Sequence, residues 1–442
     1  MMHMRQGTGT SGVNRLWGSV QRQLPDGGMV GPAALLFTAT VIGSGLDFLF
    51  HVFMARNLDV NSYSELAALM SMLMILSLPM RTVHNIMTRF VTQFIARNEP
   101  AKISWLMVRM TIITLIIGTV FMVAMFLLTP FIVDLFSLSS PLLVIILAIG
   151  VVFKLIWGVF IGVNQAFEMF GWMSIQQILA AVSKIVVGVV VVLLGYGVGG
   201  AFTAAAFAAG AALAIAALPV LKHITKERIP FEMRRVGLYA MPSLVAALSF
   251  GTLTNVDLIA VRVFIEGDVA GQFAAASQLS KLLVFIPGAV GTVLFPKVTA
   301  AMETGNDPLP IFKKAALWSL LLCVTPTILI ALMPGFVMEI VYGEAYVGAA
   351  GVLVILCMAM TLFGLASLFM VFGLATDGNR FIAIIAFFAV VEVVLMSLYN
   401  QSIEQLAIVI LAVSALMATF CLLYLTYAIR SGDGPYWRRH SV

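Results

Sequence analysis

Residues 141–165 read PLLVIILAIGVVFKLIWGVFIGVNQ, an apolar run interrupted by a single charged side chain, Lys154. About 20 apolar residues allow a helix to cross the roughly 30 Å hydrocarbon core of a membrane. Similar runs recur along the chain, which is 61% hydrophobic and only 10% charged. A soluble domain is usually about 25% charged. Because the runs are continuous rather than alternating, they predict spanning helices and not the strands of a membrane barrel.

The sequence therefore predicts an all-α, polytopic membrane protein with about twelve transmembrane helices. We expect the spans at 30–54, 64–86, 105–128, 141–165, 173–194, 200–221, 237–261, 271–295, 314–333, 350–372, 380–400 and 404–427. The remaining segments are short. They are an N-terminal segment at 1–29 with an amphipathic helix at 14–24, a linker at 222–236 and a tail at 428–442.

Lysine and arginine are distributed unevenly among the connections. One set of connections carries Arg97, Lys102, Lys222, Lys226, Arg228, Arg234, Arg235, Lys297, Lys313, Lys314, Arg380, Arg430, Arg438 and Arg439. The connections of the opposite set contain neither residue type; they are 129–140, 195–200, 334–349 and 401–404. Basic loops stay in the cytoplasm. We therefore expect a cytoplasmic (inner) membrane protein with both termini in the cytoplasm, and this asymmetry explains the net positive charge without any nucleic-acid partner.

An internal repeat relates the two halves of the chain. Arg56 ends the first span and Arg262 ends the seventh, and a proline follows each arginine after a similar interval, at Pro79 and Pro287. A basic residue then lies ten positions after each proline. This pattern predicts two six-helix lobes in the same orientation, an N-lobe at 30–221 and a C-lobe at 237–427. Bundles of this kind place the substrate path between the halves.

Several short motifs in their order along the chain resemble those of the polysaccharide-transport flippases. They are ARNLDVNSYS (55–64), NVDL (255–258), AGQFAAASQL (270–279), LFP (294–296) and YGEAY (342–346). These flippases belong to the multidrug/oligosaccharidyl-lipid/polysaccharide superfamily, which also includes the MATE transporters. The resemblance implies two MATE-like lobes that move a lipid-linked oligosaccharide across the membrane by alternating access. Asp59 and Ser64 replace the glycines of the first motif, which leaves the cargo undefined.

Ionisable residues inside the spans are the candidate site. Each costs about 2.5–3.5 kcal/mol at the bilayer centre, so we expect them to face the interior of the bundle. The candidates for binding an anionic substrate are Arg81, His84, Lys154, Lys184 and Lys281. The candidates for coupling to H⁺ or Na⁺ are Asp47, His51, Asp257 and Glu392. Fixed guanidinium and ammonium groups can replace part of the hydration of a pyrophosphate.

An alternative interpretation is structural. The intramembrane charges could pair with one another and hold helices together, for example Lys154 with Asp47. Arg56 and Arg262, at the outer edge, are expected to be interfacial or salt-bridged anchors. The three cysteines, Cys323, Cys357 and Cys421, lie in apolar runs without the spacing of a metal site or of paired thiols.

The competing functional classes differ in what they require of the sequence. The sequence has no HExxH, GxSxG or P-loop motif and only short loops, so we expect neither an enzyme nor a protein cofactor. A cation-coupled multidrug exporter of the same superfamily is the main alternative, and a carboxylate-rich cavity would suit it better. A peptidoglycan-precursor flippase would have two more spans. The expected partners are a lipid-linked glycan with an anionic pyrophosphate, membrane lipids and other polysaccharide-assembly proteins.

Overall fold

The computed structural model describes residues 30–221, 227–303, 306–376 and 380–431. The amphipathic helix expected at 14–24 lies outside these residues. The described chain is helical throughout, without strands, and 12 of its helical segments are long and apolar enough to cross a membrane. The protein is therefore a multi-pass membrane protein. Its outward faces carry many exposed apolar side chains, among them Val120, Phe126 and Leu127, which suit contact with lipid tails.

The N-lobe contains eight helices, two of which form one broken span and one of which is short. They are α2 (Val30–Asn57), α3 (Val60–Leu76), α4 (Pro79–Ala96), α5 (Pro100–Leu127), α6 (Thr129–Phe136), α7 (Leu142–Ala166), α8 (Phe170–Leu193) and α9 (Gly197–Leu221). Helix α7 packs against α4, α5 and α9, and α8 packs against α2 and α9.

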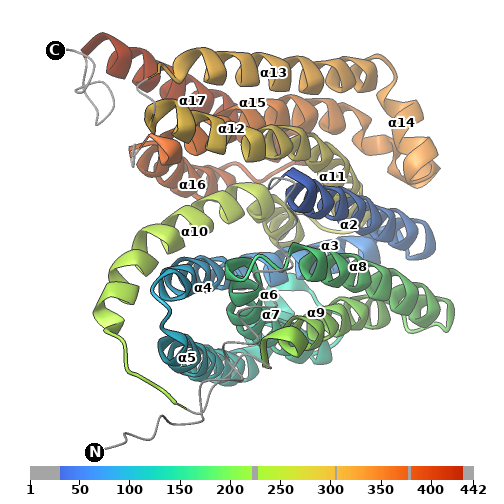
Figure 1. The fold of residues 1–442 in the computed structure, drawn as a ribbon. Helices are drawn as coiled ribbons and strands as arrows, with labels where there is room; N and C mark the ends of the chain where they lie inside the picture. The colour runs from blue at the N-terminus through green and yellow to red at the C-terminus, as the bar shows by residue number, and fades with distance from the viewer. Residues whose placement is uncertain (1–29, 222–226, 304–305, 377–379, 432–442) are drawn as a thin grey trace, which may run out of the picture.

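The C-lobe is built in the same way. Its elements are α10 (Met233–Phe264), α11 (Asp268–Ser280), η1 (Lys281–Val284), α12 (Phe285–Glu303), α13 (Leu309–Leu332), α14 (Pro334–Val341), η2 (Glu344–Ala349), α15 (Ala350–Ala375), α16 (Arg380–Leu398) and α17 (Ile403–Ser431). Helix α15 packs against α11, α12, α13 and α17. The lobes meet where α10 packs on α3 and α4 and α11 packs on α3 (Figure 1).

The second span of each lobe is broken at the position where the repeat places a proline. Pro79 starts α4 after a two-residue turn, and Pro287 lies in the first turn of α12 after the 3₁₀ segment η1. Proline has no N–H to donate and its ring collides with the carbonyl four residues earlier, so a continuous helix is disfavoured at both sites. The expected spans 64–86 and 271–295 are therefore each two helices, and they extend to Val60–Ala96 and Asp268–Met302.

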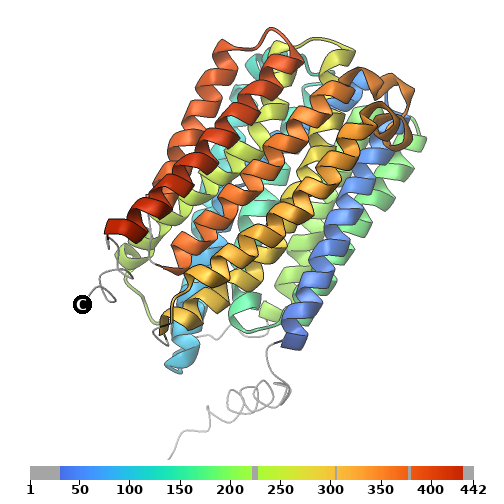
Figure 2. The ribbon, with the colours of Figure 1, turned by 90° about the horizontal axis from the view of Figure 1, so that it is seen from above.

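The connections expected at 129–140 and 334–349 are not irregular loops but contain the short helices α6 and α14. Both lie at one end of the bundle, which we call the α6/α14 end. The start of α2 (dark blue) and the last turn of α17 (dark red) lie at the opposite end, which we call the termini end (Figure 2). An even number of spans places both ends of the described chain on one side, as the sequence predicts.

Candidate functional site

A cavity of about 580 Å³ lies between the two lobes near the middle of the spans. Helices α2, α3, α4, α7, α8 and α9 line it from the N-lobe, and α10, α11 and α12 line it from the C-lobe. The polar and charged residues of its lining are Ser44, Asp47, His51, Ser71, Ser77, Arg81, Lys154, Trp157, Gln177, Lys184, Thr254, Asn255 and Gln278. The alanine-rich wall of α9 leaves room for the longer side chains opposite.

Two glycines of α7 allow two cations of this cavity, Arg81 and Lys154, to lie close together. A methyl group at Gly158 would lie 2.7 Å from the carbonyl oxygen of Met80, and one at Gly162 would lie 2.6 Å from that of His84. Helices α4 and α7 are therefore in backbone contact, a packing that only small residues permit. Lys154 lies one turn before Gly158, and Arg81 directly follows Met80, so the contact places both cations on the same part of the wall.

Within the described residues, neither Arg81 nor Lys154 has a carboxylate within salt-bridge distance. The Nζ of Lys154 lies 3.5 Å from the Sδ of Met74, a weak acceptor. Arg81 and Lys154 lie close enough to repel each other electrostatically. One turn from Lys154, the indole Nε1 of Trp157 is buried and has no acceptor in the described part of the chain. This wall therefore carries unneutralised positive charge and an unused hydrogen-bond donor.

Lys184 differs because its charge is neutralised. It forms an ion pair with Asp47 of α2, and its ammonium lies 4.5 Å from the centroid of the Phe50 ring. The Lys184 side chain is 10% exposed, whereas that of Asp47 is 55% exposed. The pairing suggested from the sequence, Lys154 with Asp47, is wrong. Asp47 faces α8, against which α2 packs along its length, rather than α7.

The two histidines have different surroundings. His51 is buried in the cavity lining, with its ring edge-on to Phe50 and Tyr63 and its Nδ1 without a partner among the described residues. His84 is not part of the lining. Its Nε2 lies 2.5 Å from the Oε1 of Gln165, which links α4 to α7. The structure thus gives His84 a contact between helices, while His51 faces the cavity.

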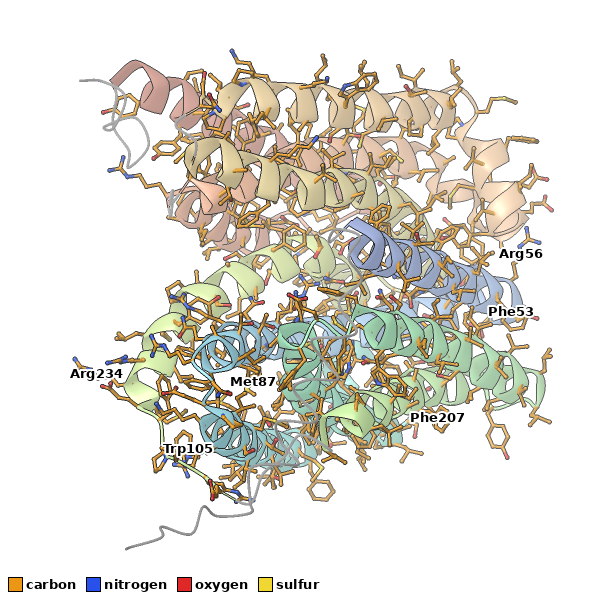
Figure 3. The ribbon with its side chains drawn as sticks, in the orientation of Figure 1. Phe53, Arg56, Met87, Trp105, Phe207 and Arg234 are labelled. Atoms are coloured by element: carbon orange, nitrogen blue, oxygen red, sulfur yellow. The ribbon has the colours of Figure 1, made fainter. Side chains whose placement is uncertain are left out.

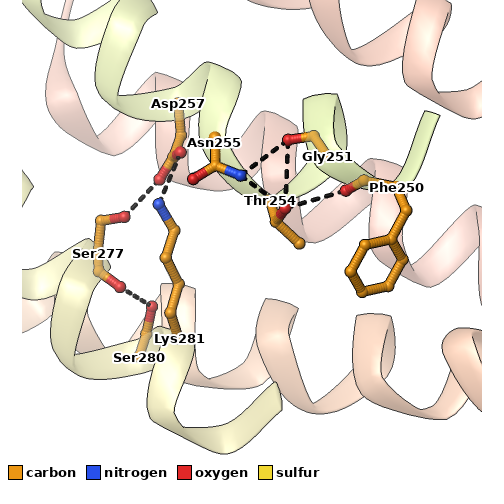
Figure 4. A network of polar contacts seen from close by, with 8 residues as sticks. All are labelled: Phe250, Gly251, Thr254, Asn255, Asp257, Ser277, Ser280 and Lys281. Atoms are coloured by element: carbon orange, nitrogen blue, oxygen red, sulfur yellow. Dashed lines mark hydrogen bonds and ion pairs between the residues drawn. The ribbon is translucent and has the colours of Figure 1, made fainter. Parts of the chain in front are cut away.

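A second polar cluster is buried within the C-lobe (Figure 4). Lys281, in η1, donates to the Oδ1 of Asp257 at 2.9 Å, and the hydroxyl of Ser277 donates to the Oδ2 of Asp257. Glu392 of α16 is 1% exposed and interacts electrostatically with both Asp257 and Lys281. Its Oε1 has no hydrogen-bond partner in the described part of the chain. Lys281 is thus held by Asp257 and is not part of the cavity lining.

Eight of the nine expected site residues divide between two places, and the ninth, His84, lies in neither. Arg81, Lys154, Lys184, Asp47 and His51 line the cavity, whereas Lys281, Asp257 and Glu392 form the C-lobe cluster. Trp157, Asn255 and Gln278 line the cavity but were not proposed from the sequence. For Trp157 a signal existed, since it lies three residues after Lys154 and hence on the same helix face. The described residues contain no group of three or more His, Cys, Asp or Glu that could hold a metal ion.

Comparison with known proteins identifies the family to which the chain belongs. Residues 32–302 match the family described as polysaccharide biosynthesis protein, which is more than half of the chain. The chain belongs to this family. No curated protein matches the chain significantly.

Solved structures show the same fold at low sequence identity. An inward-facing multidrug resistance MATE transporter superposes with a TM-score of 0.69 at 14% identity, covering 90% of this chain and 96% of that one. The lipid II flippase MurJ, in an inward closed conformation, gives 0.72 at 13% identity over 89% and 87%. A Vibrio cholerae MATE transporter gives 0.66 at 14% over 94% and 98%. The MATE-like fold expected from the sequence is confirmed, and these proteins are transporters and a flippase rather than enzymes.

The buried ion pair of the C-lobe gives a test of stability. Replacing Asp257 with alanine leaves the buried ammonium of Lys281 without its partner, which should destabilise the protein by about 3–5 kcal/mol. The double variant Asp257→Ala/Lys281→Met should recover part of this loss, because no buried cation then remains. Thermal unfolding in detergent measures both.

The matched control is Glu232→Ala, which removes an exposed partner of Arg235 and should change stability by less than about 1 kcal/mol. A double variant as unstable as Asp257→Ala alone would contradict the interpretation.

Proposed function

We propose that this protein translocates a lipid-linked oligosaccharide, carried on a polyprenyl pyrophosphate, across the cytoplasmic membrane by alternating access of its two lobes. The observation that carries the proposal is the unneutralised pair of Arg81 and Lys154 in a cavity at mid-membrane depth. Each such charge is costly to keep there, about 2.5–3.5 kcal/mol on insertion scales. An anionic cargo would offset that cost only while it is bound.

The chemistry of the wall suits a pyrophosphate. Arg81 can bind two phosphate oxygens side by side, and Lys154 adds a compact charge beside it. Trp157, with a free N–H, adds a neutral donor at the same level. Across the cavity, Asn255 and Gln278 supply amides to the same space, which suits the hydroxyl groups of a glycan. The polyprenyl chain would stay in the lipid.

Orientation follows from the charges of the two ends. Arg97, Lys102, Arg234 and Arg235 belong to the termini end, whereas the connections formed by α6 and α14 contain no lysine or arginine. By the positive-inside rule we place the termini end, with both chain termini, in the cytoplasm. The lobes that alternate are those proposed from the repeat, 30–221 and 237–427.

The C-lobe cluster supports a proposal of ion coupling. Asp257 holds the ammonium of Lys281, while Glu392 is 1% exposed and has no cation within salt-bridge distance among the described residues. A second ionised carboxylate would be strongly disfavoured there, so the cluster has a place for one H⁺ or one added cation. Of the coupling candidates, Glu392 is thus the best placed. Asp47 is instead neutralised by Lys184.

A cation-coupled multidrug exporter of the same superfamily is the alternative. The half-exposed carboxylate of Asp47 in the cavity wall is the observation in its favour, since it could attract a cationic drug. The same carboxylate is paired with Lys184, and the remaining charges of the lining are cationic.

Transport assays should separate the cargo classes. Arg81→Ala and Lys154→Ala should each reduce delivery of lipid-linked glycan to the outer leaflet by about tenfold or more, at normal protein levels in the membrane. Loss of one charge-assisted contact of about 1.5–3 kcal/mol accounts for that factor. The measurement is the appearance of labelled glycan lipid outside in reconstituted vesicles.

Lys313→Ala, which removes an exposed cation of α13, is the matched control and should leave transport unchanged. Full transport in both cavity variants would exclude the cationic wall as the cargo site. Improved export of a cationic drug in the same variants would instead favour the exporter.

Ion coupling has a separate test. We expect transport by the parent protein to respond to an imposed pH or Na⁺ gradient, and Glu392→Gln to remove that response because the amide cannot ionise. Vesicles with the two gradients imposed one at a time identify the ion. Glu404→Gln, which changes a carboxylate in the first turn of α17, serves as the control. A gradient response that persists in Glu392→Gln would remove this residue from the coupling site.

A further inference from the structure

Two arginines at the α6/α14 end bind across the lobe interface in a reciprocal way. Arg56 lies in the last turn of α2 of the N-lobe and extends toward α14 of the C-lobe (Figure 3). Its Nε donates to the carbonyl oxygen of Val341 at 2.9 Å, and its Nη2 donates to that of Ile340. These are the last carbonyl groups of α14.

Arg262 repeats this contact with the lobes exchanged. It lies in the last turn of α10 of the C-lobe. Its Nε donates to the carbonyl oxygen of Phe136 at 2.9 Å and its Nη2 to that of Ser137 at 2.7 Å, where α6 of the N-lobe ends. Its Nη1 also donates to the Oδ1 of Asn61 at 2.6 Å. The internal repeat of the sequence thus appears as two equivalent contacts.

The acceptors explain why arginine is used. The last carbonyls of a helix have no partner within the helix and form the negative end of its dipole. Two successive carbonyls match the planar fork of a guanidinium group, which a lysine ammonium would not. Neither arginine has a carboxylate within salt-bridge distance in the described ranges, so they are not the salt-bridged anchors considered from the sequence.

The same end is closed by direct packing. The hydroxyl of Tyr346 donates to the carbonyl oxygen of Ala55 at 2.8 Å, from one lobe to the other. Gly271, in α11, lies so close to the start of α3 that a methyl group there would overlap the carbonyl oxygen of Val60. At the α6/α14 end the two lobes are therefore in backbone contact, which closes this end of the cavity.

We propose that Arg56 and Arg262, with the helix ends they bind, form a releasable gate that keeps the cavity closed toward the α6/α14 end. We call this pair the arginine clasp. Arg56 is exposed and Arg262 partly exposed, so water can replace the carbonyl groups when the lobes part. Such contacts open more readily than a buried ion pair, in which separation leaves charges in a dry interior. The clasp rests on the proposed alternating access but not on the identity of the cargo.

The test measures access to the cavity from each side of the membrane. Ala181→Cys places a thiol in the cavity wall, and the native cysteines Cys323, Cys357 and Cys421 are buried. A membrane-impermeant maleimide is applied to intact cells and, separately, to inverted vesicles. In the double variant Arg56→Ala/Arg262→Ala, labelling from outside should rise about tenfold and labelling from inside should fall, because the population shifts toward the outward-open state.

Gly271→Ala is an independent variant that should shift labelling in the same direction by forcing α11 away from Val60. Arg235→Ala, which removes an exposed arginine at the termini end, should change neither rate. Unchanged outside labelling in the double arginine variant would overturn the clasp, and a rise in Gly271→Ala alone would assign closure of this end to the packing of α11 on α3 instead. Faster labelling from both sides would also overturn it, since that pattern reports general loosening. The assay measures access to the cavity and not transport, so failure of the cargo proposal leaves its result intact.

Discussion

An ionised side chain inside a membrane must be paired, hydrated or matched by a ligand, and this requirement organises the interior of the protein. Lys184 and Lys281 meet it by pairing, with Asp47 and Asp257 respectively. Arg81 and Lys154 do not, and they face the space between the lobes instead. The difference separates charges that hold helices together from charges that are available to a substrate.

The two halves of the chain share two structural features. Each lobe breaks its second span near a proline, and each ends its first span with an arginine that binds the other lobe. The halves differ in their interiors. The N-lobe presents its cations to the cavity, whereas the C-lobe buries Lys281 with two carboxylates. A duplicated scaffold with unlike interiors would allow the cations of one half to hold the charge of a cargo while the other half binds an ion, as proposed above.

Much of this architecture could be predicted from the residues, because span length and charge asymmetry are local properties of the chain. The position of a charge along its span could be predicted too, as for Lys154, which lies midway along α7. Which charged side chains pair with each other could not be predicted. Asp47 binds Lys184 rather than Lys154 because α2 lies against α8, and neighbour relations between helices arise only from the packed bundle. The helices α6 and α14 were also missed, since a segment of eight mostly apolar residues is too short to be recognised in a scan for spans of about 20 residues.

The glycine contacts between α4 and α7 have a consequence for how affinity changes during a cycle. Because helices joined backbone to backbone through Gly158 and Gly162 are closely packed, we expect them to move together. Arg81 and Lys154 would then keep a similar spacing as the lobes alternate. Release of a bound anion would not come from pulling its two ligands apart. Release would instead come when the opposite wall, with Asn255 and Gln278, moves away and water enters the cavity. Water raises the local dielectric constant, which weakens the attraction between the anion and the two cations.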